Sequence, residues 1–290
     1  MSKTLKPPKT IQEQILLMES RGIIFNDIEK AKKILIEHNY YRLTGYMYQF
    51  KENGSKYKNG IRFKKIYAIY DFDKSLRTCL FELIGILEIS FKTKLAYFMC
   101  HKYGSDFYVK KDIFKDGYLY KNFKKIIKKC INQSKDKLFI KHHMEKYGRF
   151  PFWVLVEILS FSNISKLFSN INTVDKKEFL REYYSYGLKF FENWIESISI
   201  IRNTCAHHGR LYNRNFMLIK LLEEDDIEKT GKIFDSIYIL KKLINDRLIW
   251  LKFVKDIDRS IVNHKDDVDL KLIGFPDDYL IKLKNYEKYS

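Results

Sequence analysis

The chain has 290 residues and a formal net charge of +18, with 46% hydrophobic residues but only 12 glycines and 4 prolines. This length allows one large or two modest domains with a substantial core. The scarcity of turn-forming residues argues against an all-β fold. No apolar run approaches the roughly 20 residues that cross a bilayer, which argues against a membrane protein.

The cysteines and the first residues indicate the compartment. No two cysteines form a Cys-x-x-Cys pair, which argues for a reducing compartment and against a disulfide framework or zinc knuckle. The segment that begins at Met1 lacks the apolar stretch of a signal peptide. We therefore expect a cytoplasmic protein. The cysteines are Cys79, Cys100, Cys130 and Cys205.

The positive charge suggests a polyanionic partner. Only 11 of the 54 basic residues are arginine, and a lysine-rich composition also arises from an AT-rich genome, so charge alone leaves both explanations open. The charge is partly concentrated, because residues 110–146 hold 12 lysines and 4 acidic residues. A surface that follows a phosphate backbone requires such a concentration.

The N-terminal elements begin with a helix predicted over residues 10–21 and ended by Gly22. Asn26 is a plausible N-cap of a second helix, with Glu29 at the capping-box position, and this helix extends to about His38. The aromatic-rich residues 40–63 predict either a helix plus a loop or a small hairpin. A turn at residues 52–55 closes this module, which we assign to residues 1–60.

Residues 63–101 contain no proline and one glycine, Gly85. This predicts one or two long helices. Apolar residues form one stripe along it, which we interpret as core: Phe72, Leu76, Leu80, Leu83, Leu87 and Phe91.

Apolar spacing predicts helices almost throughout the remainder of the chain. The fold class is therefore all-α, with the N-terminal module leaning on a helical bundle over residues 61–290. A basic helical insertion is expected around residues 105–150. The individual helices are predicted at residues 118–142, 152–161, 174–185, 188–207 and 231–256.

The end of the helix predicted over residues 188–207 is the candidate site. Arg202, Asn203 and His207 lie off its apolar stripe. Asn203 and His207 are four residues apart and share a face, and the long side chain of Arg202 reaches it from the side. Gly209 supplies a natural stop, so His207 lies in the last turn or just past it.

These residue types suit RNA cleavage without a metal ion. A 2′-hydroxyl loses a proton to attack the adjacent phosphate, and the departing 5′-oxygen gains one. Histidine can serve at either end, arginine can bind the phosphate through two N–H groups, and Asn203 can orient the imidazole or hold a phosphate oxygen. Because the reaction gains from both an acid and a base, we expect a homodimer with the two sites facing each other. His208 is an alternative second proton carrier.

Other interpretations of the same residues stay open. Arg202 and His207 could be ordinary capping and salt-bridge residues. His207, His208 and Cys205 could suggest metal ligation, although no other cysteine or histidine is tied to them by spacing. We assign no metal and no cofactor.

Residues 202–207 resemble the Arg-x4-His signature of the HEPN ribonucleases. The fuller string, residues 202–214, is similar to that of the Abi-like group of bacterial abortive-infection proteins, the AbiD/AbiF type. Five motifs in the same order carry the resemblance, namely residues 41–46, 70–77 with 87–93, 153–161, 202–214 and 274–276. Ser162, where the group usually has glycine, and Tyr279, where tryptophan is common, depart from the pattern; we expect these departures to affect only local packing.

The resemblance implies a HEPN-type helical bundle, a composite dimer site and metal-independent endoribonuclease activity in anti-phage defence. It assigns catalysis to Arg202, Asn203 and His207, and Glu88 is expected either to orient Arg202 or to form an internal ion pair. Trp153 and Glu157 are expected to pack in the fold and to support the site residues.

The partners expected are an RNA substrate and, as for some members of the group, a structured noncoding RNA. The alternative function is a non-catalytic scaffold or regulator that binds structured RNA. The predicted RNA-binding residues are Arg42, Lys124, Lys125, Lys128, Lys129, Arg210 and Arg214.

Overall fold

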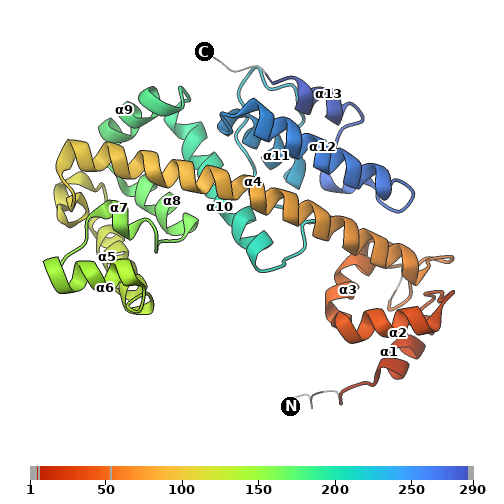
Figure 1. Ribbon diagram of the computed structural model, residues 1–290. Helices are drawn as coiled ribbons and strands as arrows, with labels where there is room; N and C mark the ends of the chain where they lie inside the picture. The colour runs from red at the N-terminus through yellow and green to blue at the C-terminus, as the bar shows by residue number, and fades with distance from the viewer. Residues whose placement is uncertain (1–4, 6, 53, 287–290) are drawn as a thin grey trace.

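The computed structural model describes residues 5, 7–52 and 54–286, and confirms the all-α fold class: this part of the chain forms thirteen α-helices and four short 3-10 helices without a β-strand (Figure 1). Most of the N-terminal segment on which the signal-peptide prediction rests lies outside the described residues. Asn53, in the predicted turn at residues 52–55, also lies outside them. No helix in the described ranges is long and apolar enough to cross a membrane.

A single long helix, α4 (Phe63–Tyr103), organises the molecule. Its 41 residues correspond to roughly 60 Å at 1.5 Å per residue. The predicted apolar stripe is buried along it. Gly85 does not interrupt it, because one glycine in a helix costs only about 1 kcal/mol. The N-terminal helices pack at its beginning and the remaining helices along its length (Figure 1).

The N-terminal module consists of α1 (Ile11–Glu19), α2 (Ile28–Glu37) and α3 (Tyr40–Met47). Helix α3 packs against α4. The predicted N-cap Asn26 is wrong: the Asp27 carboxylate instead accepts the Lys30 N–H at 2.9 Å, one residue further on. Residues 40–47 form α3, and the described part of the segment that follows is a loop with one isolated antiparallel bridge, Lys51 to Tyr57, but no hairpin strands.

Two predicted helices beyond α4 are wrong in extent. The helix predicted over residues 118–142 is divided by a turn at residues 134–137, and the one over 152–161 ends after four residues because Ser160 caps the next helix. Neither break contains a glycine or proline: residues 134–137 are Ser-Lys-Asp-Lys, and residues 156–159 are Val-Glu-Ile-Leu, ahead of the cap Ser160. The helices are α5 (Gly117–Gln133), α6 (Leu138–Tyr147), α7 (Phe152–Leu155), α8 (Phe161–Asn170) and α9 (Thr173–Tyr183).

The remaining helices are α10 (Leu188–Ala206), α11 (Ile233–Leu243), α12 (Arg247–Asn263) and α13 (Tyr279–Lys284). The single helix predicted over residues 231–256 is wrong, because Asp246 caps α12 by accepting the N–H groups of Leu248 and Ile249 at 2.8 and 3.1 Å.

The centre of the fold is the contact of α10 with α4 and α8. Phe91 of α4 lies among aromatic rings, with centroids 5.5 Å from Phe168 and 5.8 Å from Phe191. Phe191 and Trp194 of α10 are fully buried. This packing fixes α10 along its length and holds its C-terminal end in place.

Candidate active site

The C-terminal end of α10 carries the candidate motif. His207 is the C-cap, and its N–H donates to the Asn203 carbonyl at 3.0 Å. His208 follows in the left-handed conformation with φ 54°. Its N–H donates to the Cys205 carbonyl, and the Gly209 N–H donates to the Thr204 carbonyl at 2.7 Å, which is the hydrogen-bond pattern of a Schellman motif.

This turn corrects the role predicted for Gly209. His208, rather than the glycine, occupies the left-handed position that usually ends a helix. Gly209 is needed for another reason, because a Cβ there would lie 2.9 Å from Thr204 Cγ2 and 3.1 Å from the Thr204 carbonyl oxygen. A left-handed non-glycine residue costs of order 1 kcal/mol, so the backbone beside His207 is strained.

Arg202 is held on the α4 side of α10. Its Nε lies 2.8 Å from Glu88 Oε2, and its guanidinium carbon lies 5.5 Å from the centroid of Phe81. The other Glu88 oxygen accepts from Lys92 Nζ at 2.7 Å. The buried carboxylate of Glu88 therefore restrains a half-buried arginine whose terminal N–H groups can still reach a phosphate.

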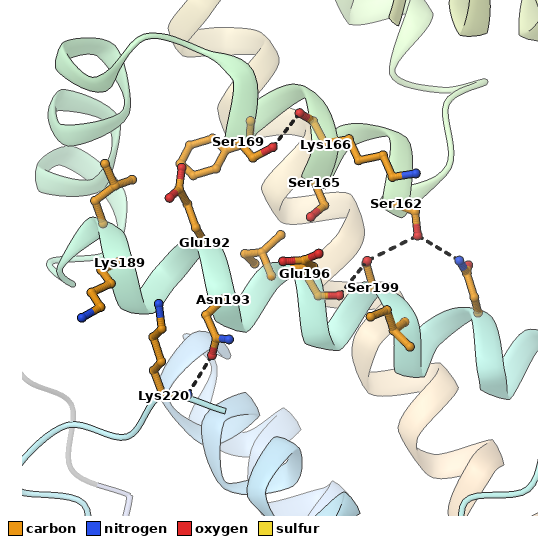
Figure 2. A pocket seen from close by; sticks show the side chains of 15 residues that line it. Ser162, Ser165, Lys166, Ser169, Lys189, Glu192, Asn193, Glu196, Ser199 and Lys220 are labelled. Carbon is orange, nitrogen blue, oxygen red and sulfur yellow. Dashed lines mark hydrogen bonds between the residues drawn. The ribbon is translucent and has the colours of Figure 1, made fainter. Parts of the chain in front are cut away.

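Asn203 is held on the opposite side of α10, against α8. Its Nδ2 donates to Ser162 Oγ at 2.8 Å, and Ser162 donates to Ser199 Oγ at 3.3 Å (Figure 2). The expectation that the Ser162 departure affects only local packing is therefore wrong. A glycine at position 162 would remove the hydroxyl that fixes the side chain of Asn203.

A groove of about 780 Å³ between α8 and α10 leads to Asn203. Figure 2 shows it extending from Ser162 to Lys189. Lys166, Lys189 and Lys220 line it, together with serine hydroxyls and the carboxylates of Glu192 and Glu196. The Glu192 carboxylate is partly neutralised by Lys176 Nζ at 2.5 Å, so the groove offers both cations and hydroxyl groups to a polar ligand.

The imidazole of His207 is exposed at the end of α10. Among the described residues it has no side-chain hydrogen-bond partner. Asn203, expected either to orient the imidazole or to hold a phosphate oxygen, bonds to Ser162. The neighbouring Cys205 thiol is buried, which raises its pKa to about 12, so it packs as an apolar residue.

Two of the predicted RNA-binding arginines join the motif to the N-terminal module. Arg42 Nη1 donates to the His208 carbonyl, and Arg210 Nη1 donates to the Gly45 carbonyl, both at 2.8 Å. Arg214 is exposed, with its guanidinium 5.2 Å from the Phe216 ring centroid. Arg42 and Arg210 thus hold the turn after α10 against α3.

The predicted RNA-binding lysines lie elsewhere. They are exposed on α5, which lies toward the far end of α4, whereas α10 ends near its middle (Figure 1). An RNA that contacts both regions of one chain must extend across α4. Otherwise it contacts α5 of one copy of the chain and the end of α10 of another. These lysines are Lys124, Lys125, Lys128 and Lys129.

The expected packing role of Trp153 and Glu157 is wrong. Trp153 is 53% exposed and Glu157 is also exposed. Both line a cavity of about 680 Å³ with Tyr97 and His101 of α4, because α7 is too short to bury its outer face.

The comparisons with known proteins place the chain in a family. The Abi-like protein family profile matches residues 33–213, which is more than half of the chain. The chain belongs to the Abi-like protein family. The match begins in α2, ends just after the Arg202–His207 motif and leaves α11, α12 and α13 outside. The family name points to abortive infection, the coarser part of the expected function. Neither the curated proteins nor the solved structures gave a match.

Three residues at this Abi-like site were not singled out from the sequence as site residues. Lys92 follows Glu88 by four residues on one helix, and this spacing could have indicated the pair. Ser162 was noted only as a departure, and Phe81 only as part of a long helix. Both contacts arise from tertiary packing between α10 and other helices, for which the sequence carries no local signal.

Proposed function

We propose that this Abi-like protein is a metal-independent endoribonuclease of abortive-infection defence, with Arg202, Asn203 and His207 as its catalytic residues. The observation that carries the proposal is the arrangement at the end of α10. An arginine held by a buried glutamate lies five residues before an exposed imidazole. Arginine can stabilise charge on a phosphate while histidine transfers a proton.

The reaction is a transesterification at one phosphodiester. The 2′-oxygen attacks phosphorus and loses its proton, the bond from phosphorus to the 5′-oxygen breaks, and that oxygen takes up a proton. The products are a 2′,3′-cyclic phosphate and a 5′-hydroxyl. His207 transfers one of the two protons and Arg202 stabilises the phosphorane oxygens. DNA lacks the attacking hydroxyl and is expected to remain intact.

The test is direct. The purified chain should cleave single-stranded RNA in excess EDTA, leave DNA of the same sequence intact and produce the cyclic phosphate end. Salt-sensitive RNA binding without any cleavage product would instead support the non-catalytic scaffold function.

The second proton carrier is proposed to come from a second copy of the chain. An apolar surface of α4 lies beside the Glu88–Arg202 pair and consists of Phe81 and Ile89, which are 44% and 68% exposed. Gly85 lies one turn from both α4 residues, and a Cβ there would meet nothing within 4 Å. Such a surface beside a charged site suits close approach of another helix.

Ile89→Glu is expected to raise the dissociation constant of the homodimer at least roughly 100-fold, because the two-fold axis would bury two unpaired carboxylates. Sedimentation equilibrium measures the constant, and RNA cleavage should fall in parallel. Ile36→Glu is the matched control, since Ile36 is also 68% exposed but lies on α2. A wild-type chain that is monomeric at the concentration where it cleaves RNA would contradict the composite site.

A further inference from the structure

A second cavity adjoins the motif on the side away from the α8–α10 groove. It has a volume of about 590 Å³, within the ~300–1,000 Å³ of typical ligand pockets. Its walls come from α2 and α3, from α4 and from the end of α10. The lining residues fall between Glu37 and His208, so the span that matches the Abi-like family contains all of them.

The cavity is continuous with the candidate active site. Cys205, Ala206 and His208 line it, and they flank His207 in the chain. Phe81 also lines it, and the ring of Phe81 lies beneath the guanidinium of Arg202. A ligand in this cavity would therefore lie next to a phosphate held by Arg202.

In the part of the chain that the structure describes, the polar wall of the cavity carries two cations without a buried counter-ion. These are Arg42 and Lys74, which line it against the carboxylates of Glu37 and Glu82, whereas the third cation, Arg77, pairs with the buried Asp73. Glu82 is partly neutralised by Lys252 Nζ at 3.1 Å. Lys74 is an exposed residue of this wall, and its ammonium group can bind a phosphate oxygen.

The apolar wall of the cavity carries flat rings. Phe81 is 44% exposed. His38 and Tyr70 meet edge to face with centroids 4.9 Å apart, and His38 Nδ1 lies 3.0 Å from the Ile34 carbonyl oxygen. This bond fixes the ring and leaves Nε2 available. Rings beside cations form the combination that binds unpaired nucleotides, through base stacking and phosphate contacts.

We propose that this cavity binds a nucleotide of the RNA strand next to the scissile phosphate, with Lys74 on its phosphate and Phe81 against its base. The inference rests on the proposed ribonuclease function and assigns the N-terminal module a part in substrate binding. Helices α2 and α3 supply Glu37, His38 and Arg42, which close the cavity over α4.

The experiment measures the affinity of the full-length chain for a fluorescein-labelled RNA octamer with 2′-O-methyl riboses, which binds without being cleaved. Lys74→Ala should weaken binding about fivefold at 0.1 M salt and reduce the slope of log affinity against log salt by about 0.7, the value of one phosphate contact on a single strand. Thr78→Phe, which fills the cavity from α4, should weaken binding and leave the slope of the residual binding unchanged. Lys64→Ala, an exposed lysine of α4 that does not line the cavity, should match the wild type.

Each outcome decides the proposal. Affinity and slope unchanged in both Lys74→Ala and Thr78→Phe would overturn it, even if the wild type cleaves RNA. Loss of affinity as expected would support it, even if the wild type cleaves nothing and the ribonuclease function fails. A mononucleotide that binds as tightly as the octamer would overturn the assignment to a strand. A midpoint of thermal unfolding equal to that of the wild type would show that each variant is folded.

Discussion

His207→Ala is expected to reduce the rate of RNA cleavage by about 10²–10⁴-fold, the usual contribution of a positioned acid or base. The imidazole is exposed at the C-cap of α10, five residues after Arg202. Alanine removes the proton carrier but keeps the backbone N–H that donates to the Asn203 carbonyl. The measurement is a single-turnover rate with an RNA labelled at both ends, in EDTA and with protein in excess.

Two variants serve as controls for His207→Ala. His142→Ala removes another exposed histidine, on α6, and should leave the rate unchanged. His208→Gly retains the left-handed turn, because glycine tolerates a positive φ. It removes only the second imidazole, so it distinguishes the contribution of His208 from that of His207. If His208→Gly lost as much activity as His207→Ala, both histidines would carry protons. Wild-type cleavage by His207→Ala would exclude His207 from the chemistry.

Most helices could be predicted from the sequence because the fold buries regular apolar stripes. The stripe from Phe72 to Phe91 returns at three- and four-residue steps, and it is buried in α4. The sequence does not mark the breaks at residues 134–137 and 244–246 strongly, because neither contains a glycine or a proline. Asp246, a strong capping residue, marked the second break, but the apolar spacing continued across it.

The site was predictable only where its residues are neighbours in the sequence or stand out chemically. Arg202 and His207 share one helix, and Glu88 is a carboxylate among apolar neighbours, so each is visible locally. The serine that bonds to Asn203 and the walls of the cavity lined by Lys74 come from segments far apart in the chain. Their proximity depends on how α3, α4, α8 and α10 pack, and local spacing does not determine that packing. The division at residue 60 and the insertion around 105–150 stay predictions.

Asp73 is expected to be the most important polar residue for stability, because it lies fully buried beneath the candidate site. It pairs with Arg77, accepts the Tyr46 hydroxyl at 2.6 Å and accepts the Tyr212 N–H at 2.9 Å. The Leu211 N–H also donates to it, at 3.2 Å. This one carboxylate therefore joins α3, α4 and the segment that follows the motif.

Asp73→Asn is expected to lower the free energy of unfolding by about 3–5 kcal/mol, because breaking a buried pair leaves the Arg77 charge uncompensated. The amide is nearly the same size, so the loss reports the missing charge and the missing acceptor oxygen rather than a cavity. Urea denaturation followed by circular dichroism measures it. Asp71→Asn is the matched control on the same helix: its carboxylate is 44% exposed and lies 3.6 Å from His264 Nε2, so the expected loss is below about 1 kcal/mol.

Asp73→Asn also tests whether the Asp73 carboxylate positions the candidate site or only stabilises the fold. Asp73 holds the backbone of Leu211 and Tyr212, and Arg210 in the same segment bonds to Gly45 of α3. Loosening this segment should release the turn at His208 that follows α10. RNA cleavage by folded Asp73→Asn should therefore fall at temperatures well below its unfolding midpoint. A variant that unfolds early but cleaves at the wild-type rate until then would show that the carboxylate stabilises the fold without positioning the site.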